Sequence, residues 1–169
     1  FVYGDKEIEY LKNRDKRLAE VIDKVGKVER EVIPDLFAAL VNAIVGQQLS
    51  TKAHKTIWER MRGELGAITP IRIDRMNVES LQKFGMTFKK AEYLKKAAPK
   101  VIHGALDIEA LRNMPDEEVC ARLVRIEGVG VWTAAMLMIF SMQRQNMTSS
   151  GDLAILSSKR MADHNWKIN

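Results

Sequence analysis

The stretch from residue 34 to residue 48 carries the strongest structural signal in this 169-residue chain. Its apolar side chains recur every three or four residues, which is the period of an α-helix. Because the apolar stripe is wide, the helix is expected to be central and buried on most sides. Pro34 stands at a favourable first-turn position. The apolar positions are Leu36, Phe37, Leu40, Val41, Ile44 and Val45.

Most other segments also have helical periodicity. Ser50 or Thr51 can cap the next helix, and Thr87 can cap a later, lysine-rich helix. Residues 131–142 form a second strongly apolar helical segment. The chain contains no alternating strand pattern with turn signals and no internal repeat. The sequence therefore predicts an all-α fold with short connections, and its 169 residues suit one compact domain or two small lobes that share a cleft.

The charge distribution narrows the class of partner. The formal net charge is +5, which favours polyanions, with nucleic acid first and an acidic membrane second. Many basic proteins bind neither, so the position of the excess charge matters more than the total. The stretch Lys83–His103 holds six lysines against a single acid, Glu92. One basic region therefore carries the excess.

Cysteine usage and the opening residues indicate the compartment. Cys120 is the only cysteine, which excludes an internal disulfide and a four-cysteine iron–sulfur site. The opening residues are too charged for a signal peptide, and no apolar run reaches membrane-spanning length. The three histidines show no metal-ligand spacing. We expect a cytoplasmic protein without a membrane partner or a catalytic metal.

Residues 123–137, "LVRIEGVGVWTAAML", predict a tight hairpin between two helices. Gly128 and Gly130 let the backbone turn sharply and approach another surface without Cβ interference. The amides of Gly128, Gly130 and Thr133 then lie at a helix amino terminus, which is a ready-made phosphate site. The alternative is a plain turn between helices, in which the glycines serve the turn alone.

This stretch resembles the helix-hairpin-helix of DNA repair glycosylases, whose usual form is Leu-Pro-Gly-Val/Ile-Gly, a residue pair and Thr-Ala. Glu127 stands where that form has proline, and an acid beside a phosphate-binding turn is mildly unfavourable. In that superfamily the hairpin often holds a monovalent cation through backbone carbonyls. The resemblance implies that Val124, Ile126 and Val129 would supply them here, and it implies no required cofactor.

Trp132 occupies the position at which bifunctional members of that superfamily carry a lysine. A lysine there forms a Schiff base with the sugar and cuts the backbone, which tryptophan cannot do. The indole can instead stack on a flipped base and attract a cationic alkylated purine. Met136 lies one turn later and would border the same pocket. The alternative is that both side chains belong to the core.

The segment "SSGDLAIL", about twenty residues after the hairpin, contains Asp152. An aspartate at such a position can simply cap a final helix. Alkylpurine glycosylases, however, have their catalytic aspartate in a similar context at this distance from the hairpin. A carboxylate facing the sugar can stabilise an oxocarbenium-like charge and orient water. The resemblance implies that Asp152 is the essential carboxylate.

Two further segments resemble the same family. The first, "IVGQQLSTKA", joins two helices, and its Gln48 is the expected wedge that fills the hole left by a flipped base, with Leu49 next. The second, "GMTFKKAEYL", opens a helix facing DNA, where Lys89 and Lys90 are expected to meet phosphates. Ordinary loop residues and solvated lysines are the alternatives.

The resemblance covers roughly residues 34–155, and three motifs in the right order carry it. The chain is identified as a helix-hairpin-helix superfamily DNA glycosylase of the alkylpurine (3-methyladenine DNA glycosylase II) type, with one such domain over residues 1–169. The resemblance implies two lobes around a base-binding cleft and a monomer that acts on damaged double-stranded DNA. Residues 156–169 match the family poorly, and the helices that normally follow are expected to be missing.

The implied reaction is hydrolysis of the N-glycosidic bond of a 3-methyladenine-like base after base flipping, which leaves an abasic site. Three alternatives stay open. A non-catalytic DNA-binding module would use the hairpin only to grip the backbone, and it would have no use for Asp152. A bifunctional glycosylase/lyase for oxidised bases is opposed by Trp132. A structural helical protein would lack salt-sensitive DNA binding.

Overall fold

The computed structural model describes residues 3–29 and 31–144, and every regular element in this part of the chain is helical. The predicted all-α fold is confirmed. None of the helices in these ranges is long and apolar enough to cross a membrane. The described residues fall into two compact units, and the division between them lies between residues 32 and 33.

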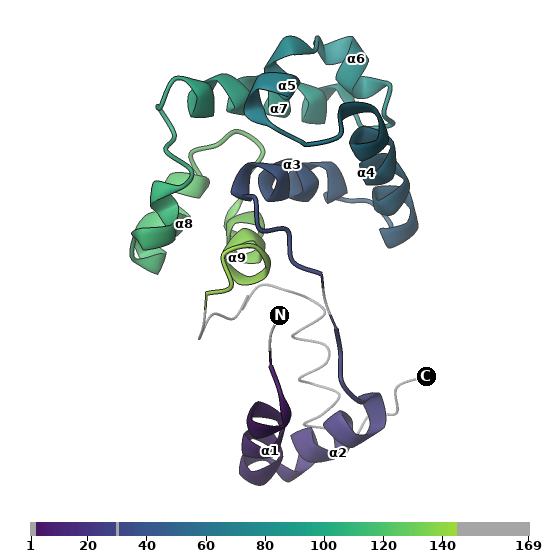
Figure 1. Ribbon diagram of the computed structural model, residues 1–169, viewed down its shortest axis with the longest axis vertical. Coiled ribbons are helices and arrows are strands. Elements are labelled where there is room, and N and C mark those ends of the chain that lie inside the picture. Colours follow the sequence, from purple (N-terminus) through teal and green to yellow (C-terminus); the bar gives the residue numbers. More distant parts are fainter. Residues whose placement is uncertain (1–2, 30, 145–169) are drawn as a thin grey trace. The chain divides into compact units, whose positions relative to one another are not determined.

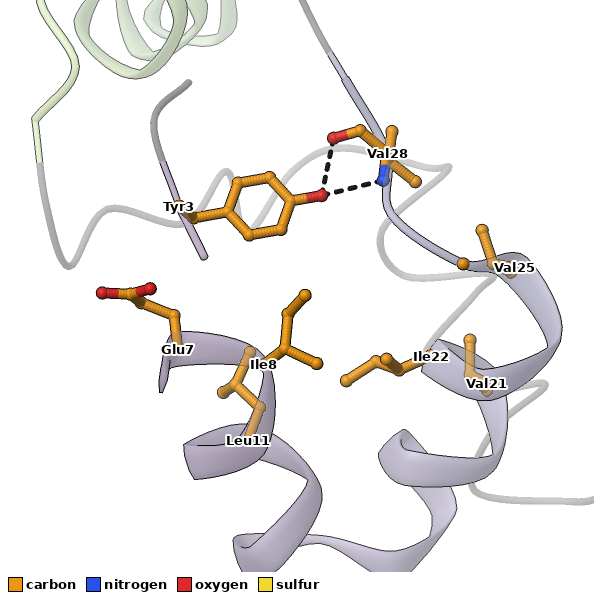
Figure 2. Close-up of a pocket in the computed structure, with 9 residues that line it drawn as sticks. Tyr3, Glu7, Ile8, Leu11, Val21, Ile22, Val25 and Val28 are labelled. Atoms are coloured by element: carbon orange, nitrogen blue, oxygen red, sulfur yellow. Dashed lines mark hydrogen bonds between the residues drawn. The ribbon is translucent and has the colours of Figure 1, made fainter. Parts of the chain in front are cut away.

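The first unit contains the helices α1 (Asp5–Arg14) and α2 (Lys16–Val25), which pack against each other. The carboxylate of Asp15 caps α2 by accepting the N–H groups of Arg17 and Leu18. The Tyr3 hydroxyl donates to the Val28 carbonyl at 2.6 Å and accepts the Val28 N–H at 2.8 Å. Figure 2 shows this pair closing over apolar side chains from both helices.

The second unit is built around α3 (Leu36–Gly46), which contacts α4 (Thr51–Leu65), α7 (Phe88–Ile102) and α9 (Val131–Phe140) (Figure 1). Leu40 and Ile44 of α3 are fully buried. The predicted central, buried helix is therefore confirmed. The remaining elements of this unit are α5 (Pro70–Arg75), α6 (Val78–Gln82), the 3₁₀ turn η1 (Ala110–Asn113) and α8 (Asp116–Leu123).

The predicted caps explain where several helices begin. Ser50 accepts the Ala53 N–H at 3.3 Å at the start of α4, and Thr87 accepts the Lys90 N–H at 3.3 Å at the start of α7. Each satisfies a first-turn amide that has no acceptor within its own helix. These two caps fix the residues at which α4 and α7 begin.

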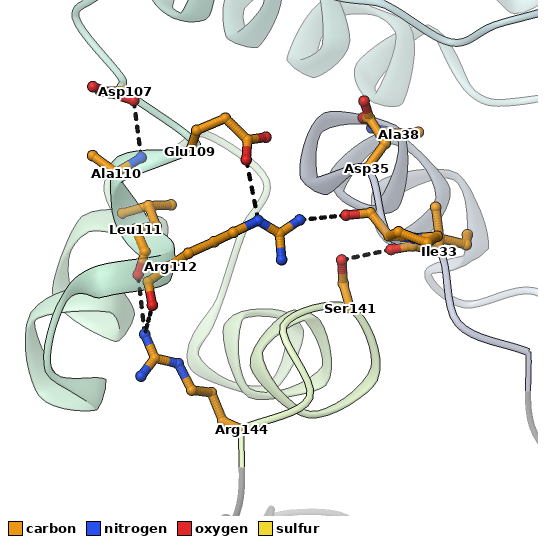
Figure 3. Close-up of polar contacts among 11 residues, drawn as sticks. Ile33, Asp35, Ala38, Asp107, Glu109, Ala110, Leu111, Arg112, Ser141 and Arg144 are labelled. Carbon is orange, nitrogen blue, oxygen red and sulfur yellow. Dashed lines mark hydrogen bonds and ion pairs between the residues drawn. The ribbon is translucent and has the colours of Figure 1, made fainter. Parts of the chain in front are cut away.

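Polar contacts hold the two ends of the unit's chain together (Figure 3). The Ser141 hydroxyl, just after α9, donates to the Ile33 carbonyl at 2.7 Å. The Arg112 guanidinium pairs with Glu109 and donates to the Pro34 carbonyl. Because α3 begins and α9 ends at these contacts, the far ends of both helices are set at the face that carries the candidate site.

Candidate nucleic-acid interface

The turn between α8 and α9 has the geometry of a tight hairpin. The Val129 N–H donates to the Ile126 carbonyl at 3.0 Å, and both side chains are buried at 4–5% exposure. Gly130 is the N-cap residue of α9, and no side chain among the described residues caps this helix. The first-turn amides of α9 therefore have no acceptor within the helix, which is the arrangement that binds phosphate.

The two glycines of the hairpin have different structural roles. Gly128 has φ +85, and a Cβ there would lie 2.3 Å from Cδ2 of Tyr93 in α7. A Cβ at Gly130 would meet no heavy atom of the described residues within 4 Å. Gly128 is therefore required by packing inside the protein, whereas Gly130 leaves exposed backbone open to another molecule.

Glu127, beside the hairpin, forms an ion pair with Lys96. Its carboxylate accepts a hydrogen bond from the Lys96 ammonium at 2.7 Å, and this bond lowers the pKa of Glu127. The same contact raises the pKa of Lys96. The mildly unfavourable acid expected from the sequence is thus paired with a cation of α7. Both side chains are half-exposed, so water and salt only partly screen the negative charge of Glu127 from a nearby phosphate.

Replacing Glu127 by Gln is expected to raise the affinity for duplex DNA by about three- to tenfold at low salt, because it removes an anion and frees Lys96. The slope of log affinity against log salt should steepen by up to about one. Salt titration of DNA binding measures both quantities. Glu64→Gln, on an exposed position of α4, is the matched control. An unchanged affinity for Glu127→Gln would mean that the hairpin does not face the DNA backbone.

The loop that follows α3 presents the predicted wedge. Gln48 has φ +55, a left-handed conformation that side chains rarely adopt, and its side chain is exposed. Leu49 is 36% exposed. Strained backbone of this kind persists where surrounding contacts impose it, often at functional sites. The loop therefore holds both predicted wedge residues at the surface.

Gln47 is a site residue that the sequence analysis did not identify. Its side-chain amide donates to the Gly128 carbonyl at 2.7 Å and to the Thr133 hydroxyl at 3.2 Å. The loop after α3 and the hairpin therefore lie side by side. Neighbouring identical glutamines gave no signal for this role, because the contact joins residues that are 81 positions apart.

The predicted phosphate role of Lys90 is wrong. Lys90 is only 8% exposed, and its ammonium donates to the carbonyls of Val45 at 2.8 Å and Gln47 at 2.5 Å. These carbonyls lie at the end of α3, where helix geometry leaves them without donors and the helix dipole favours a cation. Burial lowers the pKa of Lys90. Its neighbour Lys89 is exposed, and its phosphate contact stays a prediction.

Trp132 lies in the first turn of α9 and is 48% exposed, so it is not a core residue. Met136, one turn later, is half-buried. Thr133 is buried, and its hydroxyl faces Gln47, so any phosphate contact by Thr133 would use its backbone amide. The first turn of α9 thus places a half-exposed indole next to the hairpin amides.

His54 of α4 lies behind the wedge loop. A Cβ at Gly46 would lie 2.8 Å from Cε1 of the His54 ring. The His54 Nε2 atom is buried without a hydrogen-bond partner among the described residues. Burial lowers the pKa of His54 and outweighs a hydrogen bond to the Asn42 backbone, which acts in the opposite direction. The ring fills the space that Gly46 leaves.

The predicted catalytic residue, Asp152, lies outside the described residues.

The sequence matches a protein-family model over most of its length. The model of the HhH-GPD superfamily base excision DNA repair protein matches residues 41–165. The chain belongs to this superfamily. The predicted family is confirmed, and the match continues past residue 155, where the expected resemblance ended.

Named relatives of this HhH-GPD protein point to one branch of the superfamily. DNA-3-methyladenine glycosylase 1 of Schizosaccharomyces pombe is 30% identical over 151 residues, covering 86% of this chain and 65% of that protein. A putative DNA-3-methyladenine glycosylase of Bacillus subtilis is 23% identical over 170 residues, covering 89% of this chain and 59% of that protein. The chain thus spans about 60–65% of the lengths of these curated relatives.

Two solved structures agree with that placement. The S. pombe 3-methyladenine DNA glycosylase in complex with abasic DNA has a TM-score of 0.83 at 29% identity, covering 97% of this chain and 83% of that one. The DNA-3-methyladenine glycosidase of Bacillus halodurans has a TM-score of 0.79 at 31% identity, covering all of this chain and 79% of that one. Both alignments cover nearly the whole chain.

Proposed function

We propose that this HhH-GPD protein hydrolyses the N-glycosidic bond of alkylated purines in duplex DNA and leaves an abasic site. The observation that carries the proposal is the half-exposed Trp132 directly after the hairpin, where a lyase would need an amine. The relatives named as 3-methyladenine glycosylases support the same substrate class. Its partner would be double-stranded DNA that contains damaged bases, bound by one copy of the chain.

The described residues suggest how the DNA would be held. The hairpin amides of Gly128, Gly130 and Thr133 would bind one phosphate, and Lys89 would bind another. Gln48, with Leu49 beside it, would fill the gap that a flipped base leaves in the stack. The flipped base would stack on Trp132 and border Met136, and a cationic purine would be favoured by the ring's negative face.

Asp152 would supply the chemistry. An N3- or N7-alkylated purine is already cationic, so it leaves readily without a general acid. The bond between the sugar and the base breaks, the base takes the bonding electrons, and an oxocarbenium-like sugar is left. The Asp152 carboxylate would stabilise this positive charge and orient the attacking water.

A monovalent cation at the hairpin belongs to the same proposal. The carbonyls of Val124, Ile126 and Val129 would coordinate it. The Ile126 carbonyl already accepts the Val129 N–H at 3.0 Å, and a carbonyl oxygen has a second lone pair, so these groups fit an ion of low charge. Such an ion would hold the turn's shape for phosphate binding. The glycosidic bond cleavage would not depend on it directly.

The test is base release from duplex DNA treated with a methylating agent, with borohydride trapping in parallel. We expect free methylated purines and no covalent protein–DNA adduct. A trapped adduct would instead support a bifunctional glycosylase/lyase. Salt-sensitive DNA binding without base release would support a non-catalytic binding module, and the absence of salt-sensitive binding would support a structural helical protein.

A further inference from the structure

Helix α7 contacts both segments that would meet DNA. Lys90 binds the carbonyls of Val45, at the end of α3, and of Gln47, in the wedge loop (residues 46–50). The Tyr93 ring packs under Gly128, and Lys96 pairs with Glu127 at 2.7 Å. These three residues are spaced by three along the helix, so they lie along one side of it. The wedge loop and the hairpin are therefore supported by the same rigid element.

Gln47 completes this connection with two different parts of itself. Its backbone carbonyl accepts from Lys90 at 2.5 Å, and its side-chain amide donates to the Gly128 carbonyl at 2.7 Å. A further bond reaches the Thr133 hydroxyl at 3.2 Å. The residue directly before Gln48 is thus fixed to α7 on one side and to the hairpin on the other.

We propose that Gln47 is a positioning residue that sets the distance between the Gln48 wedge and the phosphate-binding hairpin, with Lys90 as its anchor. The inference rests on the proposed function, because a wedge has meaning only in a base-flipping protein. It deepens that function by assigning lesion discrimination to a side chain that would touch neither the base nor the phosphate.

The physical reason is the geometry of the loop. Gln48 is held at φ +55, a conformation that a flexible loop would leave unless neighbouring contacts imposed it. Residues 46–49 form a turn that the Leu49 N–H closes by donating to the Gly46 carbonyl at 3.3 Å. The four hydrogen bonds made by Gln47 and Lys90 tie this turn to α7 and to the hairpin. A wedge helps only when its tip reaches the base stack while the hairpin grips the backbone. Fixing the two segments in advance removes the cost of ordering the loop on the DNA.

The test compares Gln47→Met with the wild-type chain. Methionine keeps the length of the side chain and removes its donors. Two affinities are measured, one for a duplex with a stable abasic-site analogue and one for the same duplex without damage. The wild type should prefer the abasic duplex, and Gln47→Met should lower this preference by about tenfold, as expected for the loss of two intramolecular hydrogen bonds. Affinity for undamaged DNA should stay within about twofold, since it depends on phosphate contacts.

A double-mutant cycle with Gln48→Ala separates positioning from general stability. If Gln47 acts through the wedge, Gln47→Met should cause no further loss of preference once Gln48 is alanine. Thr133→Val, which removes one of the two acceptors, should lower the preference by about threefold. Gln82→Met in α6 is the matched control and should leave the preference unchanged. Thermal unfolding of each variant monitors the fold.

Two results would overturn the inference. The first is an equal loss of affinity for both duplexes, which would make Gln47 a merely structural residue. The second is a wild type without preference for the abasic duplex, because there would then be no wedge to position. The readout needs no cleavage, so a chain that shows the predicted preference but releases no methylated base would contradict the proposed reaction and leave the positioning role standing.

Discussion

Replacing Asp152 by Asn is expected to slow base release from methylated duplex DNA by about 10²–10³-fold, the range found when one stabilising group is removed from a developing charge. Asparagine has the same shape but no charge, so it cannot stabilise the positive sugar. Single-turnover release of methylated purines measures the effect. Binding to an abasic-site duplex should change by less than about threefold, because the wedge and the hairpin remain intact.

Asp5→Asn is the matched control, since Asp5 lies in the first turn of α1 and has no proposed part in catalysis. It should release bases at the wild-type rate. If Asp152→Asn retains full activity, the essential carboxylate lies elsewhere and the aspartate that follows Gly151 serves another purpose. If the substitution abolishes binding as well, Asp152 contributes to the fold rather than to the chemical step.

Replacing Gly128 by Ala is expected to destabilise the protein by about 2–5 kcal/mol, as the sum of two costs. A side chain at φ +85 is strained, and a Cβ would lie 2.3 Å from Cδ2 of Tyr93. Tyr93 belongs to the core-facing side of α7, so the hairpin must move away from the helix. Urea unfolding measures the loss, and DNA affinity should fall with it because the first-turn amides of α9 are displaced.

Gly130→Ala tests whether the two glycines have separate roles. A Cβ there meets no heavy atom of the described residues within 4 Å, and its φ of −91 suits any residue. Its stability should change by less than about 0.5 kcal/mol, as for a surface substitution, while its DNA affinity should fall. In a Tyr93→Ala background the collision is absent, so adding Gly128→Ala there should cost only the backbone strain. Equal stability losses for both glycines would contradict this division.

The parts of the fold that depend on local sequence could be predicted. The helical spacing of its apolar residues predicts the central helix. Ser50 and Thr87 cap helices at the positions that the sequence predicts. Gly128 and Gly130 predict the hairpin, because two closely spaced glycines between helical segments let the backbone turn sharply. In each case the physical cause acts within a few residues of the chain.

The error at Lys90 has a physical origin. A lysine in a basic helix is normally solvated, and the local pattern around Lys90 is the same as that around Lys89. Which of the two is buried depends on where the end of α3 lies relative to α7, a relation between distant segments. The same reason hides Gln47, because only its partner in the hairpin distinguishes it from Gln48.

The contact between Gly46 and His54 constrains which substitutions these two positions can accept during evolution. The ring of His54 occupies the place that a Cβ on residue 46 would need. Alanine at residue 46 therefore requires that the His54 ring move or that residue 54 carry a smaller side chain. A smaller residue at position 54 beside glycine would leave an empty space behind the loop. We therefore expect the two positions to covary, so that homologous sequences exchange both residues together or keep both.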